Sequence, residues 1–312
     1  MKELVKKVIE GDAKAIARFI TLVENRDKDA LNVIGQIHEY TGNAHIIGIT
    51  GTMGVGKSTI IGKLAKEFVE RGKKVGIIGI DPSSHFSGGA LLGDRIRMQD
   101  IILNKNVFIR SMGTRGMLGG LTGAIYDVVK ILDASGKDVI MVETVGVGQS
   151  EIDIVKMADT IVVVTIPTLG DSIQTLKAGI TEIADIFVVN KSDMPNADAT
   201  VMEIQSMLEM NKDGAWKTPV IKTIASDSEG IRKLLNKIEE HRDYLLNSKE
   251  LEERRRKRYE AEMIEIIKRR LMAFIIDEPK LREKMSSLVD KILSKEVDPY
   301  TAADEILGTL LK

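Results

Sequence analysis

A glycine-rich segment has the residue types and the spacing of a phosphate-binding loop. Residues 51–58 have the sequence Gly-Thr-Met-Gly-Val-Gly-Lys-Ser, after an apolar run at 45–50 and before a helical pattern. In this strand–loop–helix context the glycines let the backbone wrap a phosphate, and the N–H groups and the helix N-terminus point inward. A chance glycine-rich turn would rarely supply all eight positions in that context. The predicted nucleotide-binding residues here are Gly51, Thr52, Met53, Gly54, Val55, Gly56, Lys57, Ser58 and Thr59.

Three side chains of this segment have distinct predicted roles. Lys57 would place its charge on the β- and γ-phosphates of a nucleotide. The Ser58 hydroxyl is an oxygen ligand of the kind that Mg²⁺ takes, and Thr59 is within reach of the α-phosphate. Mg²⁺ and a nucleotide are therefore the expected ligands.

A second motif indicates which base is bound. Asn190-Lys191-Ser192-Asp193 follows the apolar run at 186–189. The Asp193 carboxylate can accept hydrogen bonds from both N1–H and N2–H₂ of guanine, a pair of donors that adenine lacks. Lys191 would pack its stem over the base, and Asn190 would tie this loop to the phosphate loop. GTP and GDP are therefore expected over ATP, although Asn-Lys-x-Asp without the phosphate loop would be a weak motif.

The turn after the next apolar run completes the predicted base site. Its backbone N–H groups would contact guanine O6. The residues concerned are Ile224, Ala225 and Ser226.

Three acidic residues are placed where metal and water chemistry would need them. Asp81 follows the apolar run at 75–80, Glu143 follows the run at 139–142, and Asp94 lies in Gly-Asp-Arg-Ile-Arg-Met at 93–98. The carboxyl ends of the strands are where open α/β sheets bind ligands, and a carboxylate there can hold Mg²⁺ directly or through water. Each acid alone could instead be a helix cap or a turn residue.

The residue that positions the attacking water is not evident. Small GTPases have Asp-x-x-Gly after this strand, whereas here Glu143 precedes Gly146 by three residues and no Gln directly follows that glycine. Gln149 is a weak candidate. Because positioning dominates phosphoryl transfer, we expect slow hydrolysis by the chain alone.

The elements that carry these residues alternate along the chain. Short apolar runs without polar alternation are typical of strands buried on both faces of a parallel sheet, and helical patterns lie between them. The predicted fold class is α/β, a mostly parallel P-loop NTPase sheet flanked by helices. We expect an N-terminal helical extension at 1–43, a nucleotide-binding domain at 44–245 and a C-terminal helical arm at 246–312. The apolar runs lie at 46–49, 75–80, 107–109, 139–142, 161–166, 186–189 and 220–223.

The C-terminal region contains a dense charge run at 249–258. It could bind nucleic acid, but acids interleave with the bases, which favours a solvated helix with i,i+4 pairs such as Glu252–Arg256 and Glu253–Lys257. An apolar stripe continues on the same helix and must bury against the main domain or a second subunit. The stripe consists of Ile264, Ile267, Leu271 and Phe274.

Composition excludes several functions. Lys and Arg number 45 against 46 Asp and Glu, so the charge balance predicts neither a nucleic-acid nor a membrane partner. The chain has no Cys, which excludes disulfides and thiolate sites, and its four His are scattered. No apolar run approaches the roughly 20 residues of a transmembrane helix, and the first residues lack a signal-peptide pattern. The expected location is the cytoplasm.

Taken together, these residues resemble one family, the methylmalonyl-CoA mutase-associated GTPases of the MeaB/ArgK type. The block Glu-Thr-Val-Gly-Val-Gly-Gln-Ser-Glu at 143–151 and the block at 93–98 are the most specific to it. Met53 is a departure, because the family usually has Pro there. The matching stretches are 17–24, 48–64, 81–84, 88–98, 110–116, 143–151, 170–179 and 190–193.

The resemblance implies a metallochaperone-like G protein of the class that includes signal-recognition and hydrogenase-maturation GTPases. Its expected partner is an adenosylcobalamin-dependent acyl-CoA mutase, whose cofactor loading and protection it would gate with GTP while binding no cobalamin itself. A homodimer through the C-terminal arm is expected. The resemblance implies catalytic roles for Lys57, Asp94 and Glu143, metal contacts for Ser58, Asp81, Asp94 and Glu143, and a partner-facing switch that includes Asp171 and Lys177.

Two other functions remain as alternatives. One is an ATP- or GTP-dependent accessory protein or kinase of an arginine/ornithine transport system, which the guanine motif and the lack of a membrane segment disfavour. The other is a relative that inserts nickel, which the absence of Cys and of a His cluster disfavours.

Overall fold

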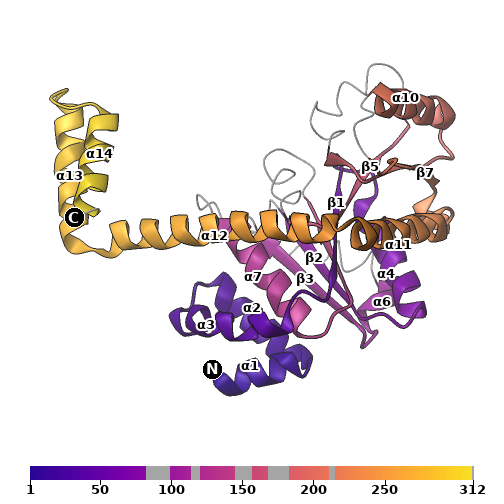
Figure 1. The fold of residues 1–312 in the computed structure, drawn as a ribbon, viewed down its shortest axis with the longest axis horizontal. Coiled ribbons are helices and arrows are strands. Elements are labelled where there is room, and N and C mark those ends of the chain that lie inside the picture. Colours follow the sequence, from indigo (N-terminus) through magenta and orange to yellow (C-terminus); the bar gives the residue numbers. More distant parts are fainter. Residues whose placement is uncertain (82–98, 114–119, 145–156, 168–182, 211–214, 311–312) are drawn as a thin grey trace. The chain divides into compact units, whose positions relative to one another are not determined.

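A computed structural model describes residues 1–81, 99–113, 120–144, 157–167, 183–210 and 215–310. Its centre is a seven-stranded sheet in the order β3-β2-β4-β1-β5-β6-β7, and every pair of neighbouring strands is parallel (Figure 1). The predicted fold class is confirmed, and each predicted apolar run forms a strand. The strands are β1 His45–Thr50, β2 Val75–Asp81, β3 Val107–Gly113, β4 Val139–Glu143, β5 Thr160–Thr165, β6 Ile186–Asn190 and β7 Val220–Thr223.

Helices connect and cover the strands. Several begin or end at residues that the sequence explains: Asp12 caps α2 by accepting a hydrogen bond from Ala15 N at 2.7 Å, and Pro279 is the first residue of α13. The helices are α1 Lys2–Ile9, α2 Ala13–Glu24, α3 Lys28–Val33, η1 Ile34–Tyr40, α4 Lys57–Glu70, α6 Gln99–Ile102, α7 Gly120–Ala134, α10 Ala197–Met210, η3 Ala225–Asp227, α11 Ile231–Ser248, α12 Glu250–Asp277, α13 Pro279–Leu293 and α14 Pro299–Leu310.

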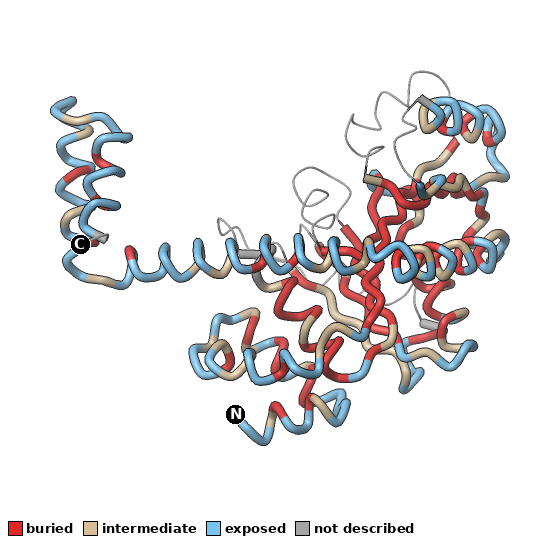
Figure 2. The backbone as a smooth tube through the Cα atoms, in the orientation of Figure 1, coloured by how far each residue is buried: buried red, intermediate tan, exposed pale blue. Residues whose placement is uncertain are grey.

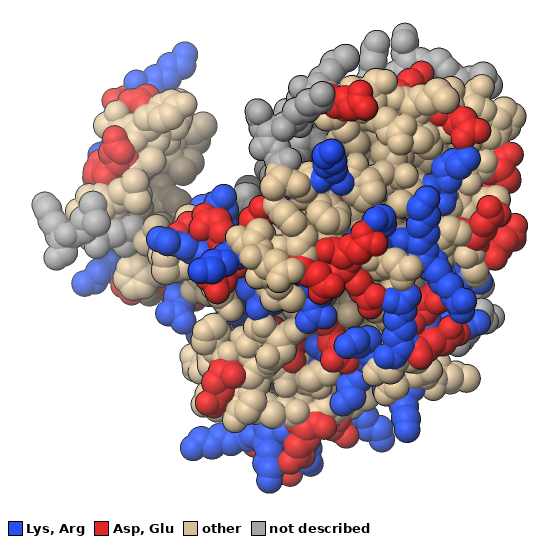
Figure 3. Space-filling view, turned by 45° about the vertical axis from the view of Figure 1, so that its right-hand side comes forward, with Lys and Arg blue, Asp and Glu red and all other residues tan. Residues whose placement is uncertain are grey.

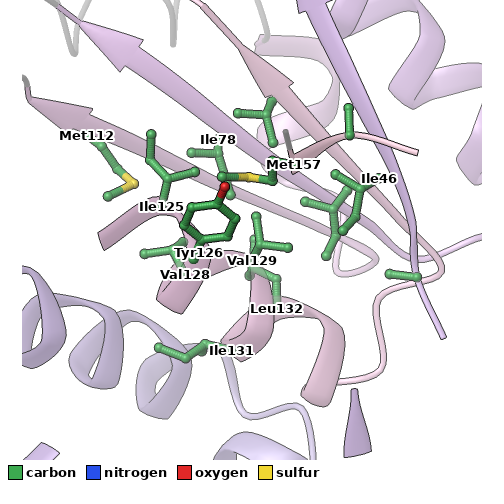
Figure 4. Packing of buried hydrophobic residues seen from close by; sticks show 14 of the residues in the cluster. Ile46, Ile78, Met112, Ile125, Tyr126, Val128, Val129, Ile131, Leu132 and Met157 are labelled. Atoms are coloured by element: carbon green, nitrogen blue, oxygen red, sulfur yellow. The ribbon is translucent and has the colours of Figure 1, made fainter. Parts of the chain in front are cut away.

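The sheet is buried on both faces. In β1, Ile46 belongs to an apolar cluster with the N-terminal helices and α7, whereas Ile47 and Ile49 belong to a second cluster with α4 and α11. Figure 4 shows α7 side chains such as Leu132 packed toward Ile46 and Ile78, and Figure 2 shows the strands as the buried centre. Since both faces are covered, the strands need apolar residues at successive positions, which is why their runs lack alternation.

By compactness the chain divides into two units, Met1–Tyr259 and Glu260–Lys312, and the dividing point lies within α12. The three-part division expected from the sequence stays a prediction. In the second unit, α13 packs on α14 through Leu288, Ala302 and Ile306. The predicted apolar stripe of α12 is exposed in the single chain, with Ile267 at 56% and Phe274 at 53% exposure.

The charge run is where the sequence-based interpretation was partly wrong. Lys257 does pair with Glu253 at 3.7 Å, as expected of a solvated helix. Three arginines of the first turns of α12 instead contact the amino ends of the strands. The reason lies in contacts between residues that are far apart in the sequence. Buried aspartates directly precede β5 and β6, and the three arginines, spaced i, i+1 and i+4, lie on the side of the helix that meets them. The three are Arg254, Arg255 and Arg258.

These contacts form a network at the amino edge of the sheet. Arg254 binds Asp185 through both terminal nitrogens, at 2.8 and 2.7 Å, and Arg258 donates to Asp159 at 3.1 Å. Arg255 Nη2 donates to Ala44 O at 3.3 Å. We call these five side chains the amino-edge network: Asp159, Asp185, Arg254, Arg255 and Arg258.

Two buried histidines lie beside this network. Thr160 Oγ1 is 2.7 Å from His45 Nε2 and 2.8 Å from His241 Nδ1. Trp216, the single tryptophan of the chain, packs against the His241 ring and donates from Nε1 to Asp185 O at 2.9 Å. Among the described residues, each of the five side chains of the amino-edge network therefore has at least one polar protein partner.

Acidic and basic side chains also alternate on the surface drawn in Figure 3. Ion pairs join α4 to α11, where Arg232 Nε lies 3.1 Å from Glu67 Oε2 and Arg71 pairs with Glu239. Among the described helices, none combines the length and the hydropathy needed to span a membrane.

Candidate functional site

The predicted phosphate loop lies between the end of β1 and the start of α4, at the carboxyl edge of the sheet. Gly51 has φ 143°, and a Cβ there would be 2.1 Å from Val164 O of β5. Gly56 has φ 96°, and a Cβ there would be 2.4 Å from Asn190 Nδ2. Both positions require glycine, because a side chain would collide with the strand or the loop beneath. The loop is thereby held close against β5 and β6.

Lys57 is 6% exposed and its side chain turns back under the loop. Its Nζ donates hydrogen bonds to Gly51 O at 2.8 Å and to Thr52 O at 3.1 Å. The ammonium group is therefore oriented by the loop that it would serve. Its position suits a charge that meets phosphate oxygens inside the loop.

Ser58 and Glu143 meet beside it. The Ser58 hydroxyl donates to Glu143 Oε1 at 2.7 Å, and the two residues are 7% and 8% exposed. A hydroxyl and a carboxylate are oxygen ligands of the kind that Mg²⁺ takes, so this pair fits the expected metal. The described residues contain no group of three His, Cys, Asp or Glu side chains that could hold a metal. One hydroxyl and one carboxylate could hold Mg²⁺ together with nucleotide phosphates and water.

Asn190 links the two predicted nucleotide-binding loops. Its Nδ2 donates to Val55 O at 2.8 Å, which is the predicted tie to the phosphate loop. Its Oδ1 accepts from Thr223 Oγ1 at 2.9 Å and from Ala225 N at 3.1 Å. One buried amide thus sets the distance between the phosphate site and the base site.

The base site is an open rim. Lys191 and Asp193 are both exposed, and Lys191 Nζ donates to Gly54 O at 3.1 Å. In the following turn, Ile224 N donates to Glu229 O at 3.1 Å. Ala225 N is also engaged, by Asn190 Oδ1. The contact of this turn to guanine O6 stays a prediction.

Some predicted site residues cannot be placed. Asp81 is the last residue of β2, but its side chain is not described. The remaining predicted residues lie outside the described residues. They are Asp94, Gln149, Asp171 and Lys177.

Sequence reasoning missed three threonines at strand ends. Thr50 ends β1, Thr144 follows β4, and Thr223 ends β7. Thr144 Oγ1 donates to Thr50 Oγ1 at 3.0 Å, and Thr223 holds Asn190. One pattern in the sequence could have identified them. Each is a hydroxyl residue at the end of an apolar run, next to a predicted site residue or on a neighbouring strand.

Comparisons with known proteins identify a matching family and several relatives. The family model described as "Methylmalonyl Co-A mutase-associated GTPase MeaB" matches residues 16–280. A Pyrococcus abyssi protein named as a GTPase is 51% identical over 99% of this chain and 96% of its own length. A Mus musculus protein named "Methylmalonic aciduria type A homolog, mitochondrial" is 35% identical over 96% of this chain and 77% of its own.

A solved structure titled "LAO/AO transport system kinase" shares the fold. It superposes with a TM-score of 0.72 at 24% identity and covers 100% of this chain and 97% of its own. At that identity the likeness concerns the fold alone.

Proposed function

The chain belongs to the family of methylmalonyl-CoA mutase-associated GTPases, and from that premise we propose that it hydrolyses GTP to GDP and phosphate. The observation that carries the proposal is the convergence of Lys57, Ser58 and Glu143 at the phosphate loop. Lys57 would neutralise the charge on the β- and γ-phosphates, and Ser58 and Glu143 would hold Mg²⁺ directly or through water. When bound, the ion would balance negative charge on the transferred phosphoryl group.

The proposed reaction should be slow in the chain alone, because no Gln directly follows Gly146 to position the attacking water. Water must attack the γ-phosphorus in line with the leaving GDP oxygen, and the positioning of that water governs the rate. Glu143 is the described acid near enough to Ser58 to take part, together with Asp94 in our proposal. We expect GTP hydrolysis by the chain alone to be slow and a partner to accelerate it.

Guanine selection is proposed to rest on Asp193, with Ser226 N–H directed at O6. In Asp193→Asn the acceptor oxygens become one acceptor and one donor, so the site should prefer xanthine nucleotides to guanine nucleotides. The measurement is competition for fluorescent GDP by GTP, XTP and ATP. Equal affinity of the wild-type protein for ATP and GTP would contradict the assignment.

We propose an adenosylcobalamin-dependent acyl-CoA mutase as the partner. The support is the family description and the relative named for methylmalonic aciduria. In this proposal GTP binding and hydrolysis time the loading of the mutase cofactor and protect the mutase, and this chain binds no cobalamin itself. Adding the mutase should raise GTP turnover, and a pull-down that recovers a transporter and no mutase would contradict the proposal.

A homodimer through the C-terminal arm is also proposed. Its support is the stripe of four apolar residues on one face of α12, which are 39–56% exposed among the described residues. Light scattering on the wild type and on Ile267→Asp tests it. A monomeric wild type would contradict it, whereas Ile267→Asp should reduce the dimer fraction.

A transport-system kinase is the weaker alternative. The solved structure with that title supports it through shared fold alone. ATP-dependent phosphorylation of a transport protein, without preference for guanine nucleotides, would favour it.

A further inference from the structure

A pair of buried hydroxyls joins the strand that precedes the phosphate loop to the strand that ends in Glu143. Thr144 is 1% exposed and Thr50 is 0% exposed. Thr144 Oγ1 donates to Thr50 Oγ1 at 3.0 Å, and Thr144 N donates to Ile49 O at 3.1 Å. Thr50 directly precedes Gly51, the first glycine of the loop. The pair therefore lies directly before the phosphate loop on β1 and directly after Glu143 on β4.

The register of the sheet explains how this pair acts on Glu143. Ile49 pairs with Glu143 across the β1–β4 ladder, so Thr50 and Thr144 come next and lie side by side. Successive strand residues point to opposite faces, so Glu143 points to the α4 face and Thr144 to the other. Ile49 belongs to the cluster that packs on α4, which agrees with Glu143 reaching Ser58 of α4.

We propose that Thr144 is a positioning residue for the Mg²⁺ site, because its bond to Thr50 holds Glu143 at hydrogen-bond distance from Ser58. The proposal deepens the proposed GTPase function and rests on it. The backbone bond from Thr144 N to Ile49 O holds the end of β4 to β1, and the bond between the two hydroxyls reinforces it through side chains. The hydroxyl bridge extends the pairing by one residue beyond the last paired position.

Matched substitutions test the proposal. Thr144→Val keeps the branched shape and removes the hydroxyl, Thr144→Ser keeps the hydroxyl, and Thr218→Val removes a hydroxyl that donates to Ala184 O at 3.2 Å, at the amino end of the sheet. The measurements are the Mg²⁺ concentration for half-maximal GTP hydrolysis, kcat, and GDP binding in EDTA. Thr144→Val should need about tenfold more Mg²⁺, the equivalent of about 1.4 kcal/mol, with GDP binding in EDTA unchanged. Thr144→Ser and Thr218→Val should stay within about twofold of wild type.

The alternative is that the bond contributes to folding alone. In that case Thr144→Val would unfold at a lower temperature with a wild-type Mg²⁺ requirement, and the proposal would be overturned. If Thr144→Val does not fold, Thr50→Val/Thr144→Val removes both hydroxyls, leaves neither unpaired, and should show the same raised Mg²⁺ requirement. A wild-type Mg²⁺ requirement in that double variant also overturns it. Absence of GTP hydrolysis by the wild-type protein, with or without mutase, would instead refute the proposed function itself.

Discussion

The two edges of one sheet treat polar groups in opposite ways. At the amino edge, Asp159 and Asp185 are bound by arginines of α12 and are almost fully buried. At the carboxyl edge, Lys57 donates to carbonyl groups of its own loop and Ser58 donates to Glu143. At the amino edge, the charged side chains pair with one another. The other edge holds a lysine and two oxygen ligands in contacts that a phosphate or a metal ion can replace.

This difference separates residues that stabilise the protein from residues that recognise a ligand. A buried pair of opposite charges is costly to break, because the remaining charge is left without a partner. A hydroxyl or a lysine beside backbone carbonyls is cheaper to rearrange, so it can exchange partners when a ligand binds. We therefore expect substitutions at the amino edge to change stability and substitutions at the carboxyl edge to change binding.

The largest expected effect is on stability. Asp185→Asn keeps the shape of the side chain but leaves Arg254 without its bidentate carboxylate, so the free energy of unfolding should fall by about 3–5 kcal/mol. Urea unfolding followed by circular dichroism measures it, with Trp216 fluorescence as a local probe. The control Asp198→Asn breaks an exposed pair with Lys222 and should cost less than about 1 kcal/mol. Equal losses in the two variants would remove the distinction between the edges.

A smaller effect is expected on nucleotide affinity. Lys57→Ala removes the charge that would meet the phosphates, so GTP affinity should fall about 100-fold, or about 2.7 kcal/mol. Lys57 Nζ donates to two carbonyl groups of its own loop, and losing these bonds should lower the free energy of unfolding by about 1 kcal/mol. Titration with fluorescent GTP and urea unfolding measure the two quantities. Lys66→Ala, an exposed lysine of the same helix, should leave both unchanged; unaltered GTP turnover in Lys57→Ala would refute the phosphate site.

The third effect is a pH dependence confined to the amino edge. Burial lowers the pKa of His45 to about 4, against the carboxylate of Asp159, which acts to raise it. Between pH values of about 6.5 and 4 the His45 imidazole is protonated in the unfolded chain but neutral in the folded chain. The free energy of unfolding therefore falls as the pH drops from about 6.5 toward 4. The lowered pKa of His45 should reduce the free energy of unfolding by about 2 kcal/mol when the pH falls from 7 to 5.

The control for that prediction is a comparison of slopes. His45→Gln should flatten the pH dependence of unfolding over this range, whereas His38→Gln, at an exposed position, should keep it. A wild-type slope in His45→Gln would show that the dependence arises elsewhere. Asp185 acts in a lower range: burial would raise its pKa, but His241 and Arg254 outweigh this and hold it below its ordinary value. Stability from Asp185 is thus present above about pH 4 and lost as pH falls through its folded pKa.

Much of the nucleotide-binding edge was predictable from the sequence. Residues 51–58 and Asn190–Asp193 are local patterns whose chemistry depends on adjacent residues, and the seven apolar runs each became a strand. The threonines were not predictable in the same way. Thr144 acts on Thr50, which is 94 positions away, and no local pattern marks the pair.

The contacts at the amino edge of the sheet were the least predictable from the sequence. Arg254 looked solvated because its sequence neighbours are charged, yet its carboxylate partner precedes it by 69 positions. The sequence by itself therefore determined the strands and the conformation of residues 51–58, and it predicts a preference for guanine, since backbone conformation and hydrogen-bond type are properties of short segments. Only the tertiary structure decided which arginines are buried, which acid meets Ser58, and which hydroxyls hold it there. Those contacts depend on strand order and register, and these arise when distant segments pack together.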